Sequence, residues 1–233
     1  PKDVGFKIGG STSIQYLTLQ IHYSHALEAG HFDRSGLSLQ VTSAPQPNVA
    51  SIYLLLANSA YIPPHSKGTH VDIACKYDSD QEINAFAFRT HAHDLGRVIT
   101  AYRIRNGAWK LLGKGDPHAP QAFYPMSNVT TIKKGDILAA RCTFDSERAT
   151  ATGIGSTASD EMCNFYMMYY RDASSNVRTP EICGDQYTYE NLYKSFPNGS
   201  DVALALAPGH HHHHHSQQSN LEGETAVNKT TNV

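Results

Sequence analysis

The chain has 233 residues, of which 40% are hydrophobic and 17% charged, and its formal net charge is −2 at pH 7. This length is enough to bury a real core, and the near-neutral charge gives no basic surface, so we expect no nucleic-acid partner. The longest apolar run, Ile52 to Ala57, is far shorter than the roughly 18 residues of a membrane-spanning helix. We therefore expect no membrane span in this chain.

Two stretches near the N-terminus alternate between apolar and polar residues. Residues 13–23 place Leu17, Leu19 and Ile21 on one face, and residues 37–41 alternate in the same way. Strict alternation is typical of a half-buried strand, so each stretch is predicted to be one. Pro45-Gln46-Pro47 then predicts a linker.

From Val49 onward, short strand-like segments follow one another with turn signals between them, and no stretch has the period of a long amphipathic helix. Asn106-Gly107 predicts a two-residue hairpin of type I′, because both residues tolerate positive φ. We expect an all-β fold, an antiparallel β-sandwich of jelly-roll type stapled by disulfides. The predicted strands are 51–57, 71–77, 83–93, 98–105, 108–112, 122–124, 136–144 and 162–170.

The strand predicted at 83–93 carries an H-x-H motif. Because side chains alternate across a strand, Arg89, His91 and His93 should share one face. The other face, directed to the core, carries Phe86, Phe88 and Thr90. Two imidazoles on one face can bind the same metal ion, and the arginine can hold a carboxylate beside it. Taken alone, the motif is more often a pair of surface histidines on a half-exposed strand, so a third ligand is needed.

Residues 162–170 offer that third ligand. Met162, Asn164 and Tyr166 should share one face of this predicted strand, opposite Cys163 and Phe165. Two neutral imidazoles and a thioether suit copper, Cu(I) especially, better than zinc, calcium or magnesium. A methionine in a strand is also a common core residue, so Met162 by itself indicates little.

Several motifs in chain order resemble the peptidylglycine α-hydroxylating monooxygenase family, the copper enzymes that begin C-terminal peptide amidation. They run collinearly across roughly residues 1–185, which is too long a match for a chance motif. Besides the H-x-H strand, the motifs are L-Q-I-H-Y (19–23), P-Q-P (45–47), I-P-P (62–64), Y-R-I-R-N-G (102–107), P-Q-A-F-Y-P (120–125), G-D-I-L-A-A-R-C (135–142) and D-E-M-C-N (160–164). Residues 91–96 read H-A-H-D-L-G, so this chain departs from the family pattern H-T-H-H-L-G at Ala92 and Asp94.

The resemblance implies an enzyme that uses O2 and ascorbate to hydroxylate the α-carbon of the C-terminal glycine of peptides. It assigns the catalytic copper to His91, His93 and Met162, and the substrate carboxylate to Arg89. The remaining residues implied in substrate binding are Asn164, Tyr166, Leu54, Leu56 and Ile154.

The resemblance also implies two coppers in the complete enzyme, and His22 in L-Q-I-H-Y is one ligand of the second. Its two companions come from an earlier stretch, and no adjacent His-His pair precedes His22 here. We therefore expect residues 1–44 to be trailing strands of an incomplete copper domain, which makes the missing N-terminal copper domain a partner. Residues 45–190 are the expected catalytic domain, and 191–233 are a tail in which His210 to His215 resemble an affinity tag.

Four cysteines allow three pairings, and the sequence alone does not choose among them. The family resemblance implies Cys75 with Cys183 and Cys142 with Cys163. Three glycosylation sequons, at Asn128, Asn198 and Asn228, accompany this even cysteine count. Together they predict a glycoprotein that is secreted or lies in the lumen of secretory granules.

Three other classes of protein share part of this pattern. A catecholamine β-hydroxylating monooxygenase would share the copper ligands but not the R-N-G hairpin or the P-Q-A-F-Y-P stretch. A cupin also uses H-x-H on a strand, but it needs a glutamate a few residues later, and Asp94 to Ile99 has none. The non-enzymatic alternative is a secreted β-sandwich that binds copper or peptide without full turnover.

Overall fold

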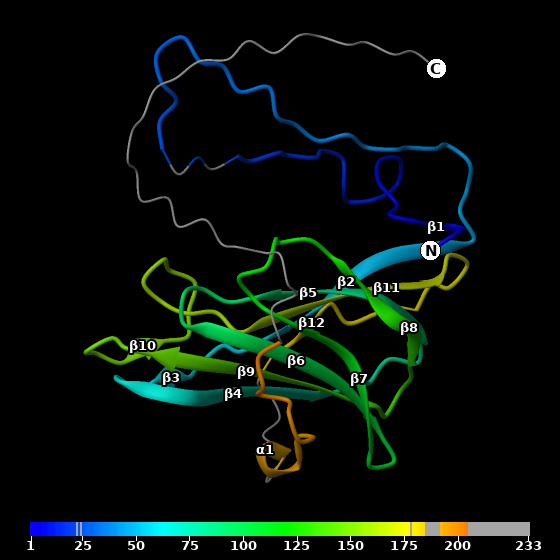
Figure 1. Ribbon diagram of the computed structural model, residues 1–233. Helices are drawn as coiled ribbons and strands as arrows, with labels where there is room; N and C mark the ends of the chain where they lie inside the picture. Colours follow the sequence, from blue (N-terminus) through cyan, green and yellow to red (C-terminus); the bar gives the residue numbers. More distant parts are fainter. Residues whose placement is uncertain (22, 24, 178, 185–191, 205–233) are drawn as a thin grey trace.

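The computed structural model describes residues 1–204 except 22, 24, 178 and 185–191, so His22 and the run His210 to His215 lie outside the described residues. The described chain is built almost entirely of β-strands (Figure 1). The longer strands are β2 (Asn48–Leu56), β4 (Ser66–Lys76), β5 (Ile83–His91), β6 (Gly96–Arg105), β7 (Ala108–Gly115), β8 (Tyr124–Ile132), β9 (Ile137–Ser146) and β11 (Asn164–Asp172). Short pairings involve β1 (Val4–Gly5), β3 (Tyr61–Ile62), β10 (Thr152–Gly153) and β12 (Ile182–Cys183).

The long strands form two sheets. The first has the order β1-β2-β11-β5-β8, with β12 added to β2, and the second has the order β4-β9-β6-β7. The main core lies between them and takes residues from both, because alternate side chains of each strand turn inward. Its largest fully buried side chains include Tyr53, Leu55, Phe165, Ile73, Ile99, Leu138 and Phe144. The predicted all-β sandwich is confirmed.

Both disulfides join one sheet to the other. Cys142 of β9 bonds Cys163, directly before β11, and Cys75 of β4 bonds Cys183 of β12. This is the pairing that the family resemblance implies. The Cys142–Cys163 bond therefore ties the start of β11 to the second sheet, close to Met162.

The turn between β6 and β7 is the predicted type I′ hairpin. Arg105 pairs with Ala108, and the two residues between them, Asn106 and Gly107, have φ angles of 50° and 77°. Positive φ at both positions matches the twist of the flanking strands.

The prediction that Phe86 shares a core-facing side with Phe88 and Thr90 was wrong. Tyr169 pairs with Ala85 whereas Met168 pairs with Ala87, so Phe86 is an extra, bulged residue in β5. A bulge shifts the alternation by one position. Phe88 stacks on buried Phe165, but the Phe86 ring instead lies 6.0 Å from that of Tyr170.

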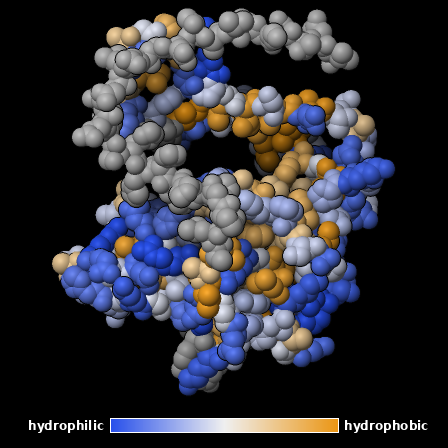
Figure 2. All heavy atoms as spheres, in the orientation of Figure 1, coloured by the Kyte–Doolittle hydropathy of each residue, from blue (hydrophilic) through white to orange (hydrophobic). Residues whose placement is uncertain are grey.

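The predicted strands at 13–23 and 37–41 are absent from the described part of the chain, where β1 is the only strand before Asn48. Leu17, Leu19 and Val41 are 59%, 55% and 76% exposed. Apolar alternation stabilises a strand only where a neighbouring strand accepts its hydrogen bonds and a second layer covers its apolar face. Figure 1 shows this segment as a long excursion away from the sandwich, and Figure 2 shows apolar residues along it.

Residues 192–203, predicted to lie in the tail, pack on the second sheet. Helix α1 (Leu192–Ser195) is followed by Phe196, which contacts the rings of Tyr102 and Trp109. The Cζ atom of Arg141 lies 4.1 Å from the centroid of the Phe196 ring. Among the described residues, no helix has the length and apolarity that a membrane crossing requires.

Candidate copper site

The two histidines of the H-x-H motif lie where β5 ends. His91 is the last residue of β5, whereas His93 stands in the turn that leads to β6 and not in the strand as predicted. The two rings are nearly perpendicular, with centroids 5.5 Å apart. Ala92 between them is buried in the core and therefore points away from the histidines, whereas Asp94 is exposed.

Hydrogen bonds fix the tautomer of both imidazoles. The Nδ1 atom of His93 is 2.7 Å from the carbonyl oxygen of Asp160, which can only accept, so this Nδ1 carries the proton. The Nδ1 atom of His91 is 3.1 Å from Oε1 of Gln121. The side-chain amide nitrogen of Gln121 donates to the carbonyls of Pro117 and Ala119, so its oxygen is the atom that faces His91 and accepts from Nδ1. In the neutral form of each ring, Nε2 is therefore the nitrogen left free to bind a metal.

The surroundings of His91 also favour its neutral form. Burial lowers the pKa of His91 below its ordinary value, and the nearby His93 and Arg89 lower it further, against the opposing effects of Gln121 and Glu161. A neutral imidazole is the one that coordinates, so this lowered pKa extends metal binding to lower pH.

Met162 reaches the same end of the sheet, although it precedes β11 and is not part of it. Asn164, the first residue of β11, pairs with His91, and this antiparallel register continued by two residues brings Met162 opposite His93. The Met162 sulfur lies 3.6 Å from Nδ2 of Asn164. Among the described residues, no three His, Cys, Asp or Glu side chains could hold a metal ion together. The available set is thus two imidazoles and a thioether, which fits copper.

A buried carboxylate that the sequence analysis did not single out joins the histidine turn to the methionine. Glu161 is fully buried. Its Oε2 accepts from the backbone N–H of His93 at 2.8 Å and of Met162 at 3.3 Å, and its Oε1 accepts from Leu95 N–H at 2.7 Å. These bonds span 68 residues of sequence, so only the folded chain reveals them.

Arg89 lies two residues before His91 on β5 and forms no ion pair with any of the described residues. Its Cζ atom is 4.1 Å from the ring centroid of Tyr166, its cross-strand partner, and 5.8 Å from that of Phe123. Its Nε is buried and finds no hydrogen-bond acceptor among the described residues. A buried donor without a partner costs about 1–3 kcal/mol, so this position favours an anionic ligand.

The predicted substrate-binding residues divide into two groups. Leu54 and Leu56 of β2 pair with Tyr166 and Asn164 of β11, and these four half-buried residues share the outer face of the first sheet with Arg89. Ile154 is only 8% exposed and belongs to the main core.

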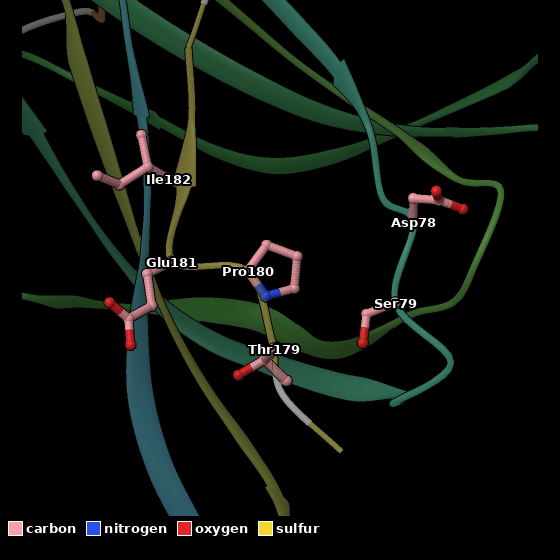
Figure 3. Close-up of a pocket in the computed structure, with 6 residues that line it drawn as sticks. All are labelled: Asp78, Ser79, Thr179, Pro180, Glu181 and Ile182. Atoms are coloured by element: carbon pink, nitrogen blue, oxygen red, sulfur yellow. The ribbon is translucent and has the colours of Figure 1, made fainter.

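A separate pocket opens beside β12 (Figure 3). It is lined by Asp78, Ser79, Thr179, Pro180, Glu181 and Ile182. None of the predicted site residues lines it, and the backbone N–H of Leu54 donates to the carbonyl of Glu181 at its edge. This pocket is therefore distinct from the copper site.

Two imidazoles and a thioether at one end of a β-sandwich are a ligand set typical of copper proteins. A family model, copper type II ascorbate-dependent monooxygenase, C-terminal domain, matches residues 48–196. The chain therefore belongs to the copper type II ascorbate-dependent monooxygenase family, and the resemblance seen in the sequence is confirmed. The family description itself names ascorbate, the expected reductant.

Curated relatives agree with this family. Peptidyl-glycine alpha-amidating monooxygenase of Mus musculus is 42% identical over 209 residues, and the protein of that name from Rattus norvegicus is 41% identical over 215. These matches cover 88% and 89% of this chain but 21% of each relative. Dopamine beta-hydroxylase of Homo sapiens is 28% identical, with 87% of this chain and 35% of that protein covered.

Proposed function

We propose that this chain is the catalytic half of a monooxygenase that hydroxylates the α-carbon of the C-terminal glycine of peptides, the first step of C-terminal amidation. The relatives with about 40% identity carry the name of a peptidyl-glycine amidating enzyme. The observation that carries the proposal is Arg89, which lies on the same strand face as His91 and whose buried Nε has no hydrogen-bond partner within the described part of the chain.

In this proposal His91, His93 and Met162 hold the copper, which when bound supplies one-electron redox chemistry for activating O2 with ascorbate as reductant. Arg89 binds the terminal carboxylate in a bidentate manner that only a free C-terminus satisfies. Asn164 and Tyr166 hydrogen-bond the peptide, so the glycine α-carbon is held beside the copper ligands.

The apolar wall of the substrate site comes from β2 and from the core beside the metal ligands. Leu54, Leu56 and Ile154 line it in this proposal and exclude water from the reacting carbon. An amine substrate such as a catecholamine fits this site less well, because its cationic nitrogen would meet the positive charge of Arg89.

Replacing Arg89 with glutamine should weaken binding of a glycine-extended peptide about 30-fold or more, because the substrate carboxylate loses a charge-assisted partner worth at least about 2 kcal/mol. Calorimetry with the peptide acid and with its carboxamide measures this effect. The wild-type protein should prefer the acid, and the variant should bind both equally. A variant that still prefers the acid would place the carboxylate elsewhere.

We further propose that the complete enzyme holds two coppers, that a missing N-terminal copper domain supplies the companions of His22, and that the protein is secreted or stored in secretory granules. All four cysteines are in disulfides, which supports an oxidising compartment. Inserting one oxygen atom of O2 into a C–H bond takes two electrons from outside the substrate, which supports a second one-electron site.

The 233-residue chain alone should hydroxylate a glycine-extended peptide at most feebly, and a chain extended through the upstream copper domain should turn over fully. The measurement is product formed per bound copper under ascorbate for both forms, with His22→Ala made in the longer one. Equal rates for the two forms, with no effect of His22→Ala, would contradict the two-copper proposal.

A further inference from the structure

One loop contacts both the arginine and the first histidine of the site. Residues 116–123, which we call the bracing loop, connect β7 to β8. Oε1 of Gln121 lies 3.1 Å from Nδ1 of His91, and the Phe123 ring centroid lies 5.8 Å from Cζ of Arg89. The loop thus contacts both the proposed copper ligand His91 and the proposed carboxylate-binding residue Arg89.

Several hydrogen bonds lie within the bracing loop. The Gln121 amide donates to the carbonyls of Pro117 and Ala119, and the backbone N–H of Ala122 donates to the Pro120 carbonyl at 2.7 Å. At the C-terminal end of the loop, the Tyr124 hydroxyl donates to the same Pro120 carbonyl at 2.8 Å. These bonds link the start of the loop to Gln121, and they link Pro120 to Tyr124, the residue after Phe123.

The N-terminal end of the loop is attached to β5. The carbonyl of Asp116 accepts from Oγ1 of Thr90 at 3.4 Å, and Thr90 stands between Arg89 and His91 in the sequence. The Asp116 carboxylate also accepts from the backbone N–H of His118. The loop is thus fastened to the strand that it braces.

Aromatic rings hold Arg89 in place. Tyr166 and Phe123 both lie within 6 Å of its guanidinium, a range in which a cation is attracted to a ring face. Since none of the described residues forms a hydrogen bond or ion pair with Arg89, these rings are what orients it.

We propose that the bracing loop couples the carboxylate site to the copper site, with Phe123 positioning Arg89 and Gln121 positioning His91. A carboxylate bound at Arg89 fixes the guanidinium against Phe123, which stabilises the loop conformation that holds His91 ready for copper. By linkage, the peptide tightens copper and copper tightens the peptide by the same factor, on the order of 5-fold or more. This inference rests on the proposed role of Arg89.

The test measures Cu(I) affinity of the full chain by competition with a chromophoric chelator, without oxygen, in the presence of the peptide acid, the peptide carboxamide or neither. His210 to His215 are replaced by alanine so that they bind no copper. In the wild-type protein the acid should raise copper affinity about 5-fold or more and the carboxamide should not. Phe123→Ala should remove this increase, and Phe123→Tyr should restore it.

Phe86→Ala is the matched control, because Phe86 is a half-buried ring on the same strand that packs on Tyr170 and is not within reach of Arg89. The Phe86→Ala protein should show the same rise in Cu(I) affinity with the peptide acid as the wild-type protein. If Phe123→Ala does not give a cooperative thermal transition, Phe123→Leu takes its place, since it keeps apolar volume without a ring. Gln121→Ala should weaken copper binding and also remove this increase, because it breaks the contact with His91 and the loop bonds to Pro117 and Ala119.

The outcomes separate this inference from the proposed function. Equal calorimetric affinity of the wild-type protein for acid and carboxamide would overturn the role of Arg89, and the coupling with it. A preference for the acid without any effect on copper affinity would overturn the coupling alone. The same conclusion would follow if Phe123→Ala and Phe86→Ala kept the same increase.

Discussion

Met162→Ile is expected to abolish the sulfur contribution to the Cu(I) X-ray absorption spectrum while the β-sandwich stays folded. Isoleucine keeps an apolar side chain of similar volume but offers no lone pair, so copper would retain only the two imidazoles. Loss of a residue that only hydrogen-bonds to a metal ligand typically lowers metal affinity about 10–100-fold. Loss of the ligand Met162 itself should lower copper affinity by at least that factor. The competition measurement with a chromophoric chelator gives the affinity, and X-ray absorption gives the ligand.

Met168→Ile is the control for this substitution. Met168 lies on the same face of β11, and its cross-strand partners are Ile52 and Ala87, well along the strand from His91. It should leave both the sulfur signal and copper affinity unchanged. Both variants need His210 to His215 replaced, because six histidines would bind copper on their own. A sulfur signal that survives Met162→Ile would show that another side chain completes the site.

Glu161→Ala is expected to lower the free energy of unfolding by about 3–5 kcal/mol, because it leaves three buried or part-buried backbone N–H groups without their acceptor. It should also weaken copper binding about 10–100-fold, since the His93 turn and Met162 lose the group that joins them. Urea unfolding gives the first quantity, provided that the dependence on denaturant is unchanged between variants. Chelator competition on folded protein gives the second.

Glu147→Ala serves as the surface control. Its carboxylate is 81% exposed and lies 3.6 Å from Lys67, so its removal should change stability by no more than about 0.5 kcal/mol. Glu161→Gln should fall between the two, because its amide keeps one acceptor oxygen and turns an NH2 group toward N–H donors. If Glu161→Ala and Glu147→Ala unfolded at the same urea concentration, the Glu161 carboxylate would not brace the site.

Local sequence was enough to predict the elements whose stability is itself local. Asn106-Gly107 determines its hairpin, since both residues adopt positive φ at low cost and the strands on either side need only pair with each other. The alternation in β11 correctly separated Asn164 and Tyr166 from buried Cys163 and Phe165. The cysteine pairing came from family resemblance, because spacing alone permits three arrangements.

Pairing across the sheet decided what alternation could not. The bulge at Phe86 arises because β5 meets β11 with one extra residue, and a one-residue change moves a side chain to the other face. The alternating residues near Leu17 and Leu19 form no strand, because no neighbouring strand among the described residues accepts their hydrogen bonds. The alternation of residues is a property of a single segment, whereas pairing and burial depend on a second segment that packs against it.

The sequence by itself determined the proposed copper ligands, His91, His93 and Met162, because those residues sit in short motifs that family resemblance identifies. Only the tertiary structure decided how the ligands are held. Gln121 reaches His91 across 30 residues and Glu161 reaches the His93 turn across 68, and no periodicity in the sequence encodes such distances. Coordination chemistry depends on the identity of single residues, but orientation depends on hydrogen bonds that exist only after the two sheets have packed.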